Sequence, residues 1–231
     1  LSLEWVVTLD ALPGVPGTKV ITLDKLLKLA RDVPIHALEE RIAGVRSRDL
    51  ATTMYTSGTT GMPKGIKFSH LNLVSKRFAR AAALPRIDDD EVLVCYLPLY
   101  HTFGRYLEML GSVHLAATYV FAGDSSTETL IRHMQRFRPT GLIGVPKKWL
   151  DLHRRIAADD EPSDDSRDLR HTVGELTGGR LRWGLSAAGR LSPSVFRFFQ
   201  NVGIDLLSGY GMTEATGGIT MTPPGEYVDD S

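Results

Sequence analysis

Residues 55–65, YTSGTTGMPKG, combine the side chains and the backbone freedom that a phosphate-binding loop needs. Glycines let backbone N–H groups converge on an anion, hydroxyl side chains add donors, and Lys64 adds a positive charge. The ordinary P-loop has Ser or Thr after its lysine and then a helix. Here Gly65 follows Lys64, and residues 66–68 are typical of a strand. The segment therefore favours a polyphosphate-binding loop between two strands over a plain Gly/Thr hairpin turn.

Another chemically suggestive stretch is LLSGYGMTEATGG at residues 206–218, the third motif in chain order. Tyr210, with a glycine on each side, can offer its ring face to a nucleotide base, and Thr213 can bond a phosphate oxygen. Glu214 can ligate Mg²⁺, a hard cation that prefers carboxylate oxygen. Alone, Tyr210 would be an ordinary core aromatic and Glu214 a charge at a helix N-terminus. Beside the first motif, the nucleotide-binding interpretation is favoured.

His101 lies between these two stretches, in LPLYHTFGR at residues 97–105, the second motif in chain order. A lone histidine after a strand is more often a structural residue than a catalytic one, so its type alone does not assign it a role.

Together, the three stretches resemble the signatures of the adenylate-forming enzymes, which include acyl-CoA synthetases, luciferases and the adenylation domains of peptide synthetases. They occur in the family's order and at family-like spacing, and the resemblance covers essentially the whole chain. The long-chain fatty acyl-CoA synthetases are the most similar branch. The resemblance implies an α/β fold with mostly parallel sheets and flanking helices, forming part of the large N-terminal domain of such an enzyme.

The resemblance also implies roles for individual residues, which divide between nucleotide, metal and acyl group. The phosphate loop would hold the β- and γ-phosphates through Thr56, Ser57, Gly58, Thr59, Thr60, Gly61 and Lys64. The third signature and a neighbouring turn would hold the rest of the nucleotide through Gly189, Ser208, Gly209, Tyr210, Gly211 and Thr213. Glu214 would bind Mg²⁺, and His101 would lie near the acyl carboxylate and the path of the incoming thiol. The catalytic candidates are His101, Thr213 and Glu214.

The reaction implied is a ligase reaction in two steps. A fatty acid carboxylate attacks the α-phosphorus of ATP and expels pyrophosphate, and the thiol of CoA then displaces AMP from the acyl-adenylate. Nothing in the sequence matches the family's ribose-binding aspartate, its hinge or its C-terminal domain with a catalytic lysine. We therefore expect a central fragment that cannot complete adenylation at a normal rate by itself.

Two other functions stay open from the sequence. One is an adenylating enzyme for an aryl, short-chain or amino acid. The other is a catalytically silent module that binds a nucleotide or an acyl group.

Bulk composition limits the classes of binding partner and the cellular compartment that we expect. The 231 residues contain 27 basic and 27 acidic side chains, so the net charge gives no case for nucleic acid binding. The single cysteine, Cys95, suits a reducing compartment. The sequence has no apolar run long enough to span a membrane and no signal peptide. We expect a cytoplasmic protein. Peripheral membrane association and oligomeric state stay open.

The elements that must position these residues alternate between strands and helices, which predicts parallel βαβ units. Expected strands lie at 92–97, 118–121, 140–145, 180–186 and 204–207, the last of which delivers the third motif as a turn. We expect three segments: an approach at 1–49, a βαβ subdomain at 50–179 with an exposed polar insert at 158–170, and the start of a second subdomain at 180–231.

Local signals predict three further features. Ser69 is expected to cap a helix whose apolar face is Leu71, Val74, Phe78 and Ala81. Ser125 and Glu128 have the spacing of a capping box. The acidic run Asp88–Glu91 is expected to be a solvated turn rather than a metal site.

Overall fold

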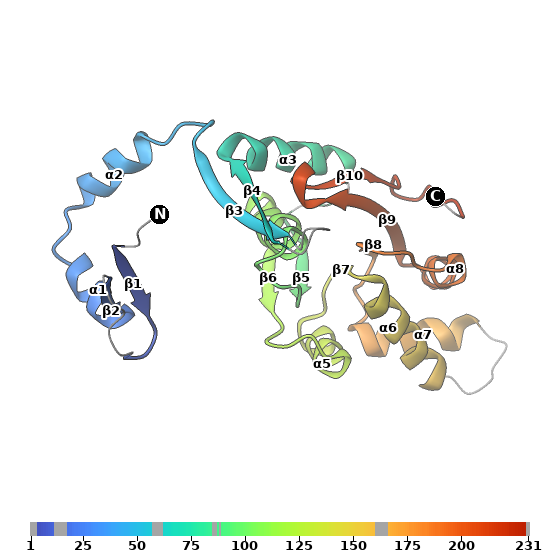
Figure 1. Cartoon of the computed structure of the whole chain (residues 1–231). Helices are drawn as coiled ribbons and strands as arrows, with labels where there is room; N and C mark the ends of the chain where they lie inside the picture. Colours follow the sequence, from blue (N-terminus) through green and yellow to red (C-terminus); the bar gives the residue numbers. More distant parts are fainter. Residues whose placement is uncertain are drawn as a thin grey trace. The chain divides into compact units, whose positions relative to one another are not determined.

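The computed structural model describes residues 4–11, 18–56, 62–84, 87, 89–159 and 166–229. The chain divides into two compact units, residues 1–49 and residues 50–231. The first unit contains β1 (Trp5–Thr8), β2 (Lys19–Thr22), α1 (Leu23–Ala30) and α2 (Ile35–Ala43), with β1 and β2 paired in parallel (Figure 1). Among its described residues, Ile21 is the one buried side chain, so this unit has little core of its own.

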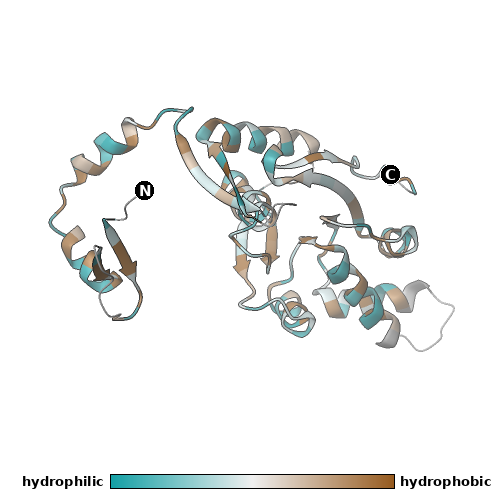
Figure 2. Cartoon of the chain, viewed as in Figure 1, coloured by the Kyte–Doolittle hydropathy of each residue, from teal (hydrophilic) through white to brown (hydrophobic). Residues whose placement is uncertain are grey.

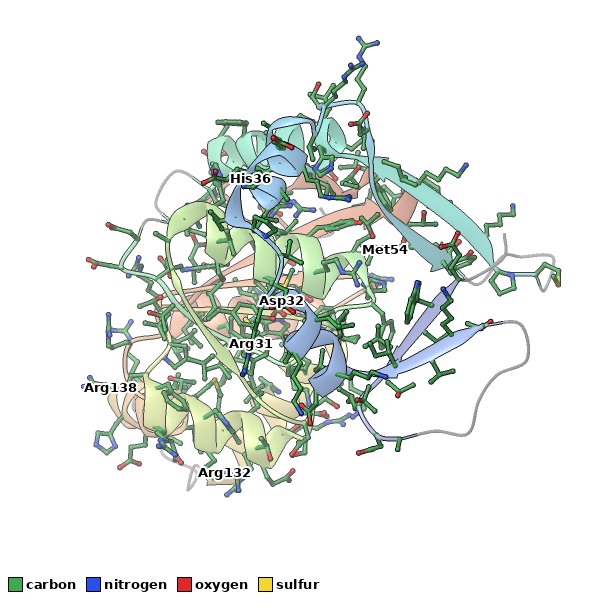
Figure 3. All side chains as sticks on the ribbon, turned by 90° about the vertical axis from the view of Figure 1, so that its left-hand side faces the viewer. Arg31, Asp32, His36, Met54, Arg132 and Arg138 are labelled. Atoms are coloured by element: carbon green, nitrogen blue, oxygen red, sulfur yellow. The ribbon has the colours of Figure 1, made fainter. Side chains whose placement is uncertain are left out.

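The second unit begins with an antiparallel hairpin of β3 (Leu50–Thr56) and β4 (Lys64–Ser69), followed by α3 (His70–Ala83). Met54 of β3, labelled in Figure 3, belongs to a small core with Phe68 of β4 and Tyr106. The Phe68 and Tyr106 rings meet edge to face at a centroid distance of 5.2 Å. These contacts fix the hairpin that carries the phosphate-loop motif against the rest of the unit.

The remaining elements build one larger sheet with its helices. Its strands are β5 (Val92–Cys95), β6 (Thr118–Phe121), β7 (Gly141–Gly144), β8 (Trp183–Ala187), β9 (Asp205–Met212) and β10 (Gly217–Met221). The helical elements are the π-helix η1 (Phe103–Met109), α4 (Leu110–Leu115), α5 (Thr127–Phe137), α6 (Pro146–Asp159), α7 (Ser166–Thr177), α8 (Pro193–Asn201) and the 3₁₀ turn η2 (Thr213–Ala215).

The order of strands in this sheet is β10-β9-β8-β7-β5-β6, and only β10 runs antiparallel to its neighbour. The chain passes from β5 to β6 on one side and then returns to β7 on the other. This is the strand order of a doubly wound sheet, in which ligands bind outside the carboxyl ends of the strands near the reversal. The α/β fold with mostly parallel strands is confirmed.

Two apolar cores cover the two faces of this sheet. Along β5, Val94 belongs to one core, which also contains Trp149, whereas Leu93 and Cys95 belong to the other. The alternation follows from the period of two in a strand. Arg138, at the end of α5 (labelled in Figure 3), donates its Nε to the Gly178 carbonyl at 2.9 Å and ties this helix to the end of α7.

Several expectations about local structure are wrong. The segment at 208–212 is not a turn: β9 continues through it to Met212, and β10 then pairs with it. Residues 160–165 of the expected polar insert at 158–170 lie outside the described residues, and α7 begins at Ser166. The helix cap is Ser126 rather than Ser125, because the Ser126 hydroxyl accepts the Thr129 N–H at 3.2 Å. The subdomain boundary expected at residue 180 lies between α7 and β8 and stays a prediction.

The helix α3 is capped as expected, but its packed face is not the apolar one. Ser69 accepts the Asn72 N–H, and Asn72 accepts the Ser69 N–H, which forms a capping box. Leu71, Val74 and Phe78, however, are 47%, 52% and 64% exposed. Hydrophilic and hydrophobic residues both occur along this helix (Figure 2), and the side chain that it buries is Arg77.

The acidic run before β5 also differs from expectation. Asp89 and Asp90 are exposed, but Glu91 is completely buried. It accepts a hydrogen bond from Trp183 Nε1 at 3.0 Å, and the Thr140 hydroxyl and the Arg182 guanidinium also donate to it. Glu91 therefore joins β5 to the entrances of β7 and β8 and is no part of a solvated turn.

Candidate functional site

The hairpin of β9 and β10 carries the third motif and forms the centre of the candidate site. Met212 pairs with Gly217 and Gly211 with Gly218, and the 3₁₀ turn with Thr213 and Glu214 connects the two strands. A Cβ on Gly211 would lie 2.3 Å from the Gly217 carbonyl oxygen, so a side chain there would break the pairing. The glycines around Tyr210 therefore allow the close strand approach that presents its ring, which is 63% exposed.

Two pockets meet at this hairpin. Pocket A encloses about 450 Å³ between α3, the start of η1 and the β9–β10 hairpin. Its wall includes six residues expected at a functional site: His101, Gly209, Tyr210, Gly211, Thr213 and Glu214. The volume lies within the range of roughly 300–1,000 Å³ that small-molecule sites occupy. Pocket A therefore brings together the three catalytic candidates.

Pocket B encloses about 870 Å³ beside the turn that follows β8. Gly189 and Ser208 line this pocket, whereas Gly209, Tyr210 and Gly211 line both pockets. Ala188 also borders both, and it adopts a left-handed backbone with φ of 66°. Such strain in a non-glycine residue costs of the order of 1–3 kcal/mol and is concentrated at functional sites.

His101 is held by the π-helix that follows it. The Phe103 N–H donates to His101 Nδ1 at 3.1 Å, so a neutral imidazole carries its proton on Nε2. A Cβ on Gly104 would lie 2.6 Å from the Pro98 carbonyl oxygen, which explains why this close turn needs a glycine. π-Helical turns such as η1 occur frequently at functional sites. The arrangement leaves a fixed Nε2–H donor at His101.

Arg105 connects this segment to the strand before the phosphate loop. Its Nε donates to the Leu99 carbonyl at 2.6 Å, and its Nη1 donates to the Thr52 hydroxyl of β3 at 3.2 Å. The sequence assigned Arg105 no role, although it is the last residue of the second motif. Its fork of donors orients the His101 segment against the hairpin.

The phosphate-loop candidates are only partly described. Thr56 and Lys64 are paired neighbours at the loop end of the β3–β4 hairpin. Thr56 and Lys64 are not among the described residues that line pocket A or pocket B. The candidates Ser57, Gly58, Thr59, Thr60 and Gly61 lie outside the described residues. The structure thus gathers the second and third motifs around two pockets and describes only the base of the first.

The wall of pocket A formed by α3 contains cations that sequence reasoning missed. Lys76 and Arg80 line it. Burial, aided by the charge of Arg77, lowers the pKa of Arg80 to about 9. Burial also lowers the pKa of Lys76, and the charges of Arg80 and Arg77 add to the effect. These residues follow the spacing of an exposed polar face, so only packing distinguishes them.

The donor set fits Mg²⁺ held jointly with a substrate. Among the described residues, no group of three or more His, Cys, Asp or Glu side chains could hold a metal ion. Magnesium is usually bound through one or two carboxylates together with substrate phosphates. A single carboxylate at Glu214, in the wall of a pocket, suits that mode.

In the described part of the chain, no helix is both long enough and apolar enough to cross a membrane.

Relatives with known roles match over most of this chain. It is 28% identical over 246 residues to palmitoyl-CoA ligase FUM16 of Gibberella moniliformis, covering 92% of the chain and 36% of that protein. It is also 28% identical over 263 residues to the long-chain-fatty-acid–CoA ligase ACSBG1 of Rattus norvegicus, covering 97% of the chain and 36% of that protein. The chain therefore spans little more than a third of the length of these relatives.

Solved structures share the fold. The ATP-bound MatB of Rhodopseudomonas palustris superposes with a TM-score of 0.66 at 29% identity, covering 90% of this chain and 38% of that one. The N-terminal domain of FACL13 from Mycobacterium tuberculosis superposes with a TM-score of 0.68 at 20% identity, covering 90% of this chain and 47% of that one. The family described as AMP-binding enzyme matches residues 4–230, and the chain therefore belongs to the AMP-binding enzyme family.

Proposed function

We propose that this chain is part of an ATP-dependent acyl-CoA ligase that activates a fatty acid through an acyl-adenylate. The observation that carries the proposal is the position of Tyr210, which lines both pockets. A reaction that joins a nucleotide to an acyl group needs two adjoining compartments with the reacting atoms between them. Thr213, Glu214 and His101 lie in the wall of pocket A, where these compartments would meet.

In the first step, a carboxylate oxygen of the acid forms a bond to the α-phosphorus of ATP, and the bond from that phosphorus to the pyrophosphate oxygen breaks. In the second step, the thiol sulfur of CoA bonds to the acyl carbon, its proton is lost, and AMP leaves. The acid is its own nucleophile, so the protein mainly positions groups and offsets charge on phosphate oxygens.

Each residue has a defined part in this proposal. Pocket B would hold adenine against the exposed ring of Tyr210, and pocket A would hold the acyl group. The Thr213 hydroxyl would donate to the α-phosphate, and Lys64 with the rest of its loop would hold the outer phosphates. His101 would offer Nε2–H to the acyl carboxylate. Glu214 would hold Mg²⁺, which supplies charge neutralisation to the phosphates.

The acyl group is the least constrained part of the proposal. The names of relatives refer to palmitoyl and long-chain acyl groups, and a solved relative at 26% identity with a TM-score of 0.69 is a malonyl-CoA ligase. The first two favour a fatty acid. Another acid, or a module that binds without turnover, would give a different result in the assay below.

The test is ATP–pyrophosphate exchange, followed by CoA-dependent release of AMP, in the protein expressed over its whole open reading frame. Exchange that depends on a fatty acid supports the ligase. Binding of ATP without exchange on any carboxylic acid would favour the silent module. We expect this chain alone to bind nucleotide weakly and to show no exchange.

Two variants link the assay to the site. Because one stacked base is worth about 1–3 kcal/mol, Tyr210→Ala should weaken ATP binding about 5- to 150-fold, whereas Tyr210→Phe should retain most of it. Glu214→Gln should lower the exchange rate and raise the Mg²⁺ concentration needed. Glu226→Gln, an exposed carboxylate outside both pockets, is the matched control.

A further inference from the structure

Three cations lie close together on α3, and two of them are in the wall of pocket A. Lys76 and Arg80 line the pocket, and Arg77 is buried on the same helix with 7% of its surface exposed. None of the three takes part in an ion pair among the described residues. The Glu214 carboxylate also lines pocket A, but it forms no ion pair with them and is assigned to the metal in the proposed function.

The hydrogen bonds of these cations leave several donors unused. Lys76 Nζ donates to the Gly218 carbonyl at 2.7 Å, and Arg80 Nη2 donates to the Thr216 carbonyl at 3.1 Å. Arg80 Nη1 and the Nε and Nη2 atoms of Arg77 are buried without a hydrogen-bond partner in the described residues. Buried donors without acceptors are costly, and those of a charged group most of all.

Spacing along the helix adds repulsion to this cost. Arg80 lies three and four residues after Arg77 and Lys76, where side chains on a helix are neighbours and like charges repel. Burial lowers the pKa of Arg77 to about 10. The site thus disfavours its own positive charges as it stands, and an anion in the pocket would relieve that cost.

A purely structural role for the α3 cations does not explain their unused donors and mutual repulsion. The bonds to Gly218 and Thr216 do attach α3 to β10, but neutral donors could make them without repulsion. The wall of pocket A is otherwise largely apolar and includes Ala79, Leu107 and Leu185, so the cations of α3 are charged groups in an apolar wall. A plain hydrocarbon chain in this pocket would leave them unsatisfied, because a methyl end cannot accept a hydrogen bond from a cation.

We propose that Lys76 and Arg80 form an anion subsite in pocket A, and that the acyl substrate is a dicarboxylic acid whose second carboxylate binds there. This inference rests on the proposed function. The reacting carboxylate belongs beside Thr213 and Glu214 in the turn, and the cations bind the segment that follows it: Arg80 at Thr216 and Lys76 at Gly218. The two ends of a diacid would thus bind neighbouring parts of the same wall, and a monocarboxylic acid would leave the cations unpaired.

The experiment compares acids of equal carbon number in ATP–pyrophosphate exchange by the protein expressed over its whole open reading frame. The pairs are hexanoate with adipate, decanoate with sebacate, and hexadecanoate with hexadecanedioate. For at least one pair we expect kcat/KM to be about tenfold or more higher for the diacid, as charge-assisted hydrogen bonds imply. This comparison needs no variant, so a folding defect cannot obscure it.

Variants then locate the effect. Lys76→Met and Arg80→Met should lower kcat/KM for the diacid more than for the matched monoacid, and so remove most of the diacid preference. Lys67→Met, an exposed lysine on β4, is the control and should change neither rate. If Arg80→Met does not fold, Lys76→Met and the wild-type comparison still decide.

The outcomes separate the two proposals. Exchange with monoacids that equals or exceeds exchange with every matched diacid would overturn the anion subsite and leave the ligase standing. Equal losses for both members of a pair in Lys76→Met would do the same. No exchange with any acid would overturn both.

Discussion

Two glutamates of this protein are almost completely buried, and their surroundings are opposite. Glu91 is 0% exposed, and three donors reach its carboxylate: the Thr140 hydroxyl, the Arg182 guanidinium and Trp183 Nε1. Glu108 of η1 is 1% exposed, and no donor among the described residues makes a hydrogen bond of normal geometry to either carboxyl oxygen. Burial raises its pKa well above the usual range, and the nearby Leu97 N–H offsets only part of this.

The difference shows that partners, and not burial, determine what a buried charged side chain does. Glu91 stabilises the sheet because its donors come from the segments that enter β7 and β8. Glu108 has no such donors, so its site favours the neutral acid. The cations of α3 are a third case: they lack a carboxylate partner, as Glu108 lacks donors, but two of them line a pocket that an anion can enter.

The largest expected effect is at Glu91. Glu91→Ala should lower the free energy of unfolding by about 3–5 kcal/mol, because it removes the carboxylate that accepts from the buried Thr140 and Trp183 donors and pairs with Arg182. Urea unfolding of the purified variant measures this. Asp89→Ala, in the exposed turn just before, is the control and should stay within about 0.5 kcal/mol of wild type. A loss at Glu91 below 1 kcal/mol would contradict its structural role.

A smaller loss is expected at Thr140, one of the donors. Its hydroxyl donates to Glu91 and accepts the Val92 N–H at 2.9 Å, so Thr140→Val should cost about 1–3 kcal/mol in the same unfolding experiment. Thr177 is an equally buried threonine whose hydroxyl only returns to the Val173 carbonyl of its own helix. Thr177→Val should therefore cost less than Thr140→Val, and the reverse order would break the comparison.

At Glu108 the expected change is a gain that depends on pH. Burial raises the pKa of Glu108 in the folded state above its pKa in the unfolded chain, which is about 4.3. The contribution of Glu108 to the free energy of unfolding is therefore most favourable below the unfolded-state pKa, and it is lost as pH rises through the folded-state pKa. Glu108→Gln cannot titrate, so its stability relative to wild type should improve from pH 5 to pH 8.

Unfolding free energies of both proteins at the two pH values check this. The nearby Cys95 and Tyr119 have pKa values raised by burial and stay neutral over this range. A difference between the proteins that is the same at both pH values would mean that Glu108 does not retain its proton on folding.

The smallest expected effect is at Lys76. Lys76→Met removes the bond to Gly218 but also removes repulsion with Arg80, so stability should change by less than about 0.5 kcal/mol. Thermal unfolding beside Lys67→Met measures it. A loss above about 1.5 kcal/mol would place Lys76 with Glu91 as a structural residue and weaken the case for an anion subsite.

Much of the fold follows from local pattern. The spacing of apolar residues predicts most strands and helices of residues 50–231, and Ser69 marks the start of α3 because capping depends on a few neighbouring residues. Motifs in the sequence also point to His101, Gly189 and residues 208–214, which lie around two adjoining pockets. The π-helix at 103–109 was not predicted, because its wide turns depend on how Gly104 packs on Pro98.

The sequence by itself determined the family, the alternation of strands and helices, and the residue types available for nucleotide and acyl chemistry. These depend on which residues follow one another. The tertiary structure alone decided that β9 runs through the third motif to pair with β10, that Glu91 lies inside the sheet, and that α3 turns its cations to pocket A. Burial and pairing depend on segments far apart in the chain. The type of a charged residue does not show whether its side chain contacts water, a hydrogen-bond donor or a ligand.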